Sequence, residues 1–87
     1  MKVRNMTSNN GNTIANQFII ESDKGKTFQS YDSIICHVPN NGKTQLDQKY
    51  WNYSKTTSKY RNQFLYETTK ETEAKIKSGE YELTDLN

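Results

Sequence analysis

Three turn signals divide the first half of the chain into short segments of strand character, and they restrict the possible folds more than any other feature. Each is a dipeptide ending in glycine, and Asn-Gly in particular favours tight hairpins because both residues tolerate positive φ. The dipeptides are Asn10-Gly11, Lys24-Gly25 and Asn41-Gly42. Strands rich in β-branched and aromatic residues are predicted between them, at residues 3–6, 13–21, 27–31, 33–38 and 43–46. The short connections predict an antiparallel meander of four to five strands.

The second half of the chain changes to helical periodicity. Helices are predicted over residues 57–66 and 69–78. In the first of them Tyr60, Phe64 and Leu65 share one face, because side chains three and four positions apart lie together on a helix. This apolar face predicts that the helix packs on one side of the sheet.

Local signals define the second helix and suggest a further strand. Thr68 and Glu71 have the spacing of a capping box, in which each side chain bonds the other residue's backbone N–H. Tyr81 and Leu83 then alternate with polar residues and suggest a last short strand. We expect one α+β domain over residues 1–87, a small antiparallel sheet with one or two C-terminal helices packed on one face.

The composition predicts a folded chain with a lean core. Leu, Ile, Val and Phe number fifteen of 87 residues, but the net charge is only +2 and aromatic residues make up 11% of the chain. Disorder requires high net charge and few aromatics, so we expect a core that depends on Tyr, Phe and Trp. A domain of this size buries only about 60–65% of its unfolded surface. We therefore expect a stabilising partner, either another protein or a second copy in a homodimer.

Cysteine usage and hydropathy predict a cytoplasmic protein. Cys36 is the only cysteine, so no disulfide can form within the chain, which fits a reducing compartment. No apolar run approaches the length needed to span a bilayer, and the N-terminus lacks the apolar core of a signal peptide. The pI of about 8.7 is too mild to diagnose nucleic-acid binding. We expect no contact with a membrane.

The sequence carries no motif for catalysis or for metal binding. Cys36 and His37 are adjacent, but neighbours in a strand face opposite sides, and no other Cys or His could complete a zinc site. There is no Gly-x-Ser-x-Gly elbow and no glycine-rich phosphate loop. Glu67, Glu71 and Glu73 lie among lysines and predict a solvated helix face. We therefore expect no catalytic residue, no metal and no cofactor.

Residues 50–65 form the strongest candidate for a binding site, because they contain five aromatic rings and three cations. Cations can hold phosphates, rings can stack on unpaired bases, and a hydroxyl-rich helix start can seat an anion. The same rings could instead complete the core. The candidate partner-binding residues are Tyr53, Lys55, Thr56, Thr57, Lys59, Tyr60 and Arg61.

Arg61 is the exceptional residue of this segment, because helical periodicity places it inside the apolar face of the first helix. A guanidinium there cannot be left without partners. It must bond a carboxylate, a backbone carbonyl or an external ligand. We expect an internal ion pair with an acidic residue, and a ligand contact remains the alternative.

Three segments and a short ending carry a resemblance to a known family. They are residues 16–20, 28–35 and 51–65, with the ending 75–81, and the most specific element is Tyr53-Ser54-Lys55-Thr56-Thr57 before Phe64-Leu65. Over nearly the whole chain these residues resemble a family of small proteins of unknown function, carried by phages, prophages and plasmids of Gram-positive bacteria. Members of the family tend to carry alanine where this chain has Cys36.

The resemblance implies a mobile-element setting in the cytoplasm of a bacterial host, and it implies no activity. Small phage proteins often antagonise host defences, so we expect a non-enzymatic accessory protein that binds a host protein complex and inhibits a defence system such as CRISPR–Cas. One alternative is a small nucleic-acid-binding module that uses residues 55–61. Another is a protein that sequesters a nucleotide or small anion through Arg61 and the helix start.

Overall fold

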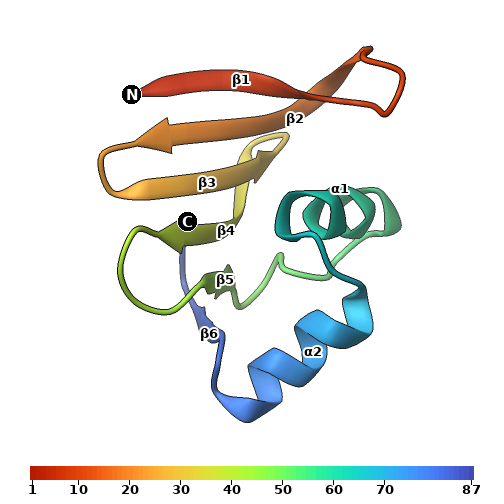
Figure 1. Ribbon diagram of the computed structural model, residues 1–87. Coiled ribbons are helices and arrows are strands. Elements are labelled where there is room, and N and C mark those ends of the chain that lie inside the picture. Colours follow the sequence, from red (N-terminus) through yellow and green to blue (C-terminus); the bar gives the residue numbers. More distant parts are fainter.

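The chain forms one six-stranded sheet and two helices in the computed structural model, which describes all of residues 1–87 (Figure 1). The strands and helices in chain order are β1 Lys2–Thr7, β2 Thr13–Ser22, β3 Gly25–Ser30, β4 Ser33–Pro39, β5 Gln45–Asp47, α1 Lys55–Leu65, α2 Thr69–Ser78 and β6 Glu82–Thr84. The predicted α+β fold is confirmed, and every boundary lies within two residues of its predicted position.

The strands follow one another across the sheet in sequence order, from β1 at one edge to β6 at the other. Each of the first four pairings is antiparallel, which confirms the predicted meander, whereas β6 pairs with β5 in parallel. A parallel neighbour requires a crossover connection. Helices α1 and α2 supply it, and they carry the chain from β5 to the far edge of the sheet (Figure 1).

Helix α1 begins two residues before its predicted start because of a cap. The Ser54 side chain accepts a hydrogen bond from the Thr57 N–H at 3.1 Å, so the helix begins at Lys55. It ends where Tyr66 adopts a left-handed conformation with φ of 57°. The capping box predicted for α2 is confirmed, with both of its hydrogen bonds present.

A bulge in β4 interrupts the alternation of its side chains. Phe28 pairs with Cys36 and Gln29 pairs with Ile34, so Ile35 is an extra residue between the two pairs. A bulge of this kind breaks the alternation of side chains along a strand. Ile35 and Cys36 are therefore both completely buried, although regular alternation predicts that they face opposite sides.

The core lies between the sheet and α1 and is completed by aromatic rings, as the composition predicts. Its fully buried members are Met6, Phe28, Ile35, Cys36 and Leu46. Partly buried residues pack around them: Ile14, Ile19, Tyr50, Trp51, Tyr60, Phe64, Leu65, Ile76 and Tyr81. The rings of Phe28 and Phe64 stack with centroids 5.7 Å apart, which joins α1 to the middle of the sheet. The predicted apolar face of α1 is thereby confirmed.

Gly42→Val is expected to lower the free energy of unfolding by about 1–2 kcal/mol, because Gly42 has φ of 105° in the turn between β4 and β5 and a β-branched residue is strained there. The nearest atom to an added Cβ would be Cγ of Pro39 at 4.0 Å, so strain and not collision sets the effect. Thermal unfolding measures it, and Lys43→Val at the exposed neighbouring position is the control. Equal melting temperatures for the two variants would contradict the assigned turn.

Candidate functional site

Arg61 of α1 is completely buried, and its guanidinium is bound by neutral oxygens. Its two terminal nitrogens donate to oxygens of Trp51, Asn52, Ser58, Asn62 and Thr69. The acceptor on Trp51 is the backbone carbonyl, and the bonds to Asn62 and Thr69 measure 3.0 and 2.9 Å. These contacts tie α1 to the turn before it and to the first residue of α2.

The ion pair predicted for Arg61 is wrong, because all four ion pairs of the protein involve other residues. The guanidinium carbon lies 5.2 Å from the ring centroid of Trp51, and Nε has no hydrogen-bond partner. Burial lowers the pKa of Arg61 below its ordinary value, yet an arginine stays protonated at neutral pH. A full positive charge therefore lies inside the domain with no carboxylate in direct contact, and the charge of Glu67 acts on it only from a distance.

A polar pocket of about 400 Å³ lies beside this buried charge. Three acceptors of Arg61, namely Asn52, Ser58 and Thr69, line it together with Tyr53, Ser54 and Lys55. The N–H groups of Lys55 and Thr56 open the first turn of α1 and have no protein acceptor. The first turn contains no acidic residue. The pocket therefore combines hydroxyls and positive charge beside a helix N-terminus, which suits an anion.

The structure divides the seven predicted site residues between surface and interior. The exposed ones are Tyr53, Lys55, Thr56 and Lys59. Tyr60 is half-buried against the core, and Nζ of Lys59 lies 5.3 Å from its ring centroid. Thr57 and Arg61 are buried, and the Thr57 hydroxyl lies 3.0 Å from the hydroxyl of Ser30 in β3. Thr57 and Arg61 therefore position the site and do not present themselves to a partner.

Residues 48–66, hereafter the basic segment, contain no Asp or Glu, and sequence reasoning overlooked this. Their four cations are Lys49, Lys55, Lys59 and Arg61, which give the segment a charge of +4. Nζ of Lys49 lies 5.3 Å from the ring centroid of Tyr50, and the centroids of the Tyr50 and Tyr53 rings are 5.3 Å apart in an edge-to-face arrangement. A count of charges along the chain would have found Lys49, whereas nothing in the sequence links Thr69 to the pocket.

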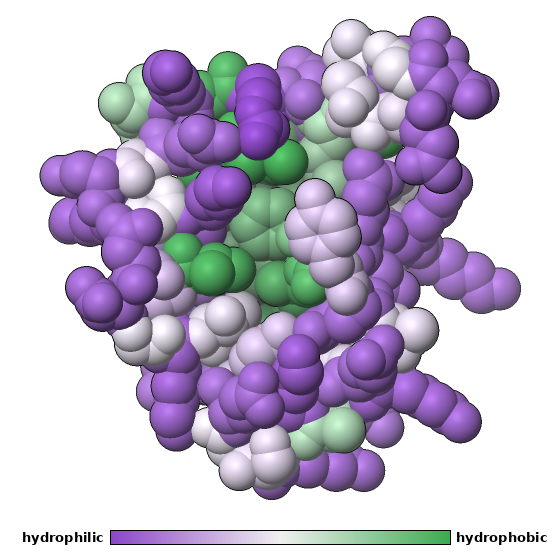
Figure 2. Space-filling view, viewed as in Figure 1, coloured by the Kyte–Doolittle hydropathy of each residue, from purple (hydrophilic) through white to green (hydrophobic).

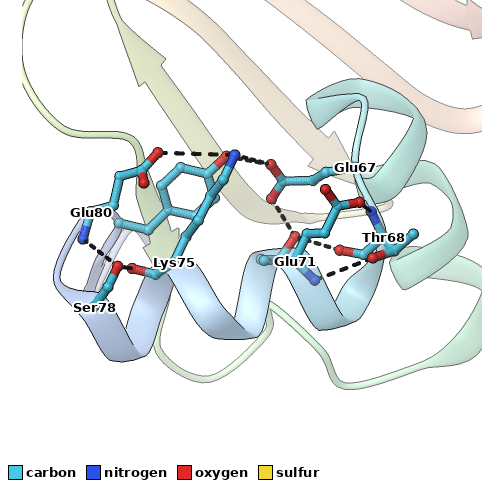
Figure 3. A network of polar contacts seen from close by, with 8 residues as sticks. Glu67, Thr68, Glu71, Lys75, Ser78 and Glu80 are labelled. Atoms are coloured by element: carbon cyan, nitrogen blue, oxygen red, sulfur yellow. Dashed lines mark hydrogen bonds and ion pairs between the residues drawn. The ribbon is translucent and has the colours of Figure 1, made fainter.

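Glu67 is buried in a polar cluster, so its predicted place on a solvated helix face is wrong. Only 3% of its side chain is exposed, and its carboxylate accepts hydrogen bonds from Lys75 at 2.8 Å, from the Tyr81 hydroxyl at 2.7 Å and from Thr72. Figure 3 shows Lys75 of α2 reaching between Glu67 and Glu80. The cluster clamps the α1–α2 connection to α2 and to the chain before β6.

Cys36 and His37 lie apart, as strand alternation predicts for adjacent residues. Cys36 is part of the core, and burial raises the pKa of its thiol far above the ordinary value. His37 lies on the opposite face of the sheet, where its Nδ1 is 2.8 Å from the hydroxyl of Thr27. No group of three or more His, Cys, Asp or Glu side chains gathers closely enough to hold a metal ion.

Neither α1 nor α2 is long and apolar enough to cross a membrane.

Comparisons with known proteins show which family the chain belongs to. No curated protein and no solved structure matches the chain. Residues 1–81 match the model of a family of unknown function, DUF8033. The chain therefore belongs to the DUF8033 family.

Proposed function

We propose that this protein acts by binding a macromolecular partner, through the exposed side chains at the N-terminal end of α1. These side chains, hereafter the α1 surface, are Tyr53, Lys55, Thr56 and Lys59, with Lys49 beside them. The observation that carries the proposal is the position of Lys55. It is the first residue of α1, where the helix dipole favours an anion and disfavours a cation.

Lys59 adds a second unfavourable feature to the same surface. It lies four positions after Lys55, so the two like charges are neighbours on the helix and repel each other. Arg61 adds a buried positive charge behind them, and none of its hydrogen-bond partners is a carboxylate. Sequences that break local rules in this way do so characteristically at functional sites. Carboxylates on an acidic partner surface would attract these cations and offset the repulsion between them.

A host defence complex is the partner class that we propose, with the protein as its non-enzymatic inhibitor. The support is the resemblance of the chain to small proteins of phages, prophages and plasmids. An electropositive surface with aromatic rings can cover an acidic patch on such a complex, for which aromatic anchors supply affinity and charges supply orientation. A homodimer stays a prediction, and the outer face of the sheet offers apolar side chains for it at Val3, Phe18, Ile20 and Ile34.

The double variant Lys55→Glu/Lys59→Glu is expected to fold normally and to lose function, because glutamate at position 55 suits the helix dipole, the repulsion between the two positions stays as in the parent, and the charge of the α1 surface is reversed. The measurement is phage plating efficiency on hosts that each carry one defence system, with matched hosts that lack it. Lys70→Glu/Lys77→Glu on α2 is the control and is expected to act like the parent. Equal activity of the two double variants would contradict the proposed surface.

A nucleic-acid-binding module is the second candidate, and the cations and rings of a carboxylate-free segment favour it. Binding of labelled oligothymidine would then weaken steeply with salt, with a slope of log K against log salt near −0.7 per phosphate contact, or about −2 for three lysines. A protein interface built on aromatic anchors has a shallower dependence. Binding of a free nucleotide alone, at the pocket beside Arg61, would instead indicate the sequestering role.

A further inference from the structure

A second surface lies at the opposite end of α1, where the helix leaves part of the sheet uncovered. A groove of about 390 Å³ runs between the C-terminal end of α1 and strands β1 to β3. Met6, Ile19 and Phe64 contribute its apolar lining, while Arg4 and Lys26 contribute cations. Figure 2 shows apolar side chains gathered between the strands and α1, with hydrophilic ones around them.

The groove includes the strand at the free edge of the sheet. Strand β1 pairs only with β2, so its other side presents backbone N–H and C=O groups without partners. Four consecutive β1 residues, 4–7, line the groove, and the pairing of β1 with β2 is irregular between Asn5 and Thr7, which breaks the alternation of side chains. This part of β1 therefore forms one wall of the groove. At one end Nε2 of Gln63 donates to the Thr7 carbonyl at 2.9 Å, which leaves residues 2–6 for another strand.

Tyr66 borders the groove and is the left-handed residue that caps the C-terminal end of α1, with its N–H bonded to the Asn62 carbonyl. Its φ of 57° is left-handed, where glycine and asparagine are favoured and other residues are strained. Its side chain is 94% exposed, so the ring gains no packing in return. Strain of this kind is typical of functional positions. An exposed ring beside an apolar groove is suited to anchor a partner.

We infer that this groove and the free edge of β1 bind an extended segment of another protein, which adds a strand beside β1. Such strand addition takes affinity from backbone hydrogen bonds and specificity from alternate side chains. Lys26 makes no ion pair, and Arg4 makes only one, with the exposed Glu21, in which the nitrogen and oxygen atoms are 2.9 Å apart. The bound segment therefore carries acidic side chains toward Arg4 and Lys26 and apolar ones toward Phe64.

A second copy of the chain is a poor occupant of this edge. Antiparallel pairing of residues 2–6 with the same residues of another copy would set Arg4 opposite Arg4, and like charges directly opposite are destabilising. Pairing between the β1 strands of two copies is therefore disfavoured, and pairing with an acidic strand is favoured. The groove lies at the C-terminal end of α1, so this inference is independent of the α1 surface at the N-terminal end.

The test is selection from a phage-displayed library of random twelve-residue peptides on the immobilised protein. Enriched peptides are expected to carry Asp or Glu at alternate positions. A synthetic copy is expected to bind Tyr66→Asn and Arg4→Glu/Lys26→Glu at least about tenfold more weakly than the parent. Lys55→Glu/Lys59→Glu is expected to keep the peptide affinity, which separates this inference from the proposed function.

Tyr31→Asn is the matched control, because Tyr31 is also exposed and also left-handed, with φ of 53° in the turn between β3 and β4. Both asparagine variants are expected to melt about 2–5 °C higher than the parent through relief of strain, but only Tyr66→Asn loses the peptide. A selection that enriches no sequence would overturn the inference. So would peptides that bind Tyr66→Asn and Arg4→Glu/Lys26→Glu as tightly as the parent.

Discussion

Arg61→Ala is expected to lower the free energy of unfolding by about 3–5 kcal/mol. The substitution removes a completely buried side chain and a hydrogen-bond donor from the oxygens of Trp51, Asn52 and Thr69. A domain of this length has a total stability of roughly 4–13 kcal/mol, so the variant would lose a large part of it. Urea unfolding followed by circular dichroism measures the change.

Two further variants separate the contributions of charge and packing at this position. Arg61→Met fills most of the volume without a buried charge, and we expect it to be more stable than Arg61→Ala. Arg61→Lys keeps the charge but loses the planar fork that reaches both helices, so we expect it to resemble Arg61→Ala. If Arg61→Ala melted like the parent but abolished partner binding, the internal hydrogen bonds would not be the reason for this arginine.

Glu67→Ala is expected to lower the free energy of unfolding by about 2–4 kcal/mol, the second largest effect. The carboxylate accepts hydrogen bonds from Lys75, Tyr81 and Thr72. Its removal takes this acceptor away from the buried Thr72 hydroxyl and from the Tyr81 hydroxyl. Lys75 is partly exposed and can return to water, which keeps the effect below that of Arg61→Ala. Thermal unfolding of Glu67→Ala and of Glu73→Ala, an exposed glutamate of α2, provides the comparison.

The same glutamate is expected to make stability depend on pH in the acid range. Burial by itself would raise the pKa of Glu67, but hydrogen bonds from Lys75, Thr72 and Tyr81 outweigh it and lower that pKa below the ordinary 4.5. A carboxyl whose pKa is lower in the folded state stabilises the fold above its unfolded pKa. This stabilisation is lost as the pH falls from about 4.5 through the lower, folded value.

Glu67→Gln is expected to flatten the acid limb of a plot of unfolding free energy against pH. Part of the loss of stability at acid pH will remain in this variant because of Asp47. Burial raises the pKa of Asp47, but hydrogen bonds from the N–H groups of Leu86, Tyr50 and Lys49 outweigh burial and lower it. Urea unfolding between pH 3 and pH 7 measures both curves. Parallel curves for the parent and Glu67→Gln would show that Glu67 titrates alike in the folded and unfolded chains.

Local physics was sufficient to predict most of the fold. Turn dipeptides, strand alternation and the capping box at Thr68 and Glu71 depend on residues close in sequence, so the sequence alone reveals them. All the predicted strands and helices form. The same periodicity correctly placed Tyr60, Phe64 and Arg61 on the packed face of α1.

Tertiary structure decided what the polar groups contact, because those contacts join segments that lie apart in the sequence. Sequence reasoning recognised that Arg61 needs partners, but only packing brought it the Thr69 hydroxyl in place of a carboxylate. Glu67 has the sequence context of an exposed glutamate, but the path of the chain through α2 to β6 brings the Tyr81 hydroxyl to its carboxylate and buries it. The groove beside β1 likewise depends on the tertiary structure, because residues of β1, β2, β3 and α1 that lie far apart in the sequence line it together.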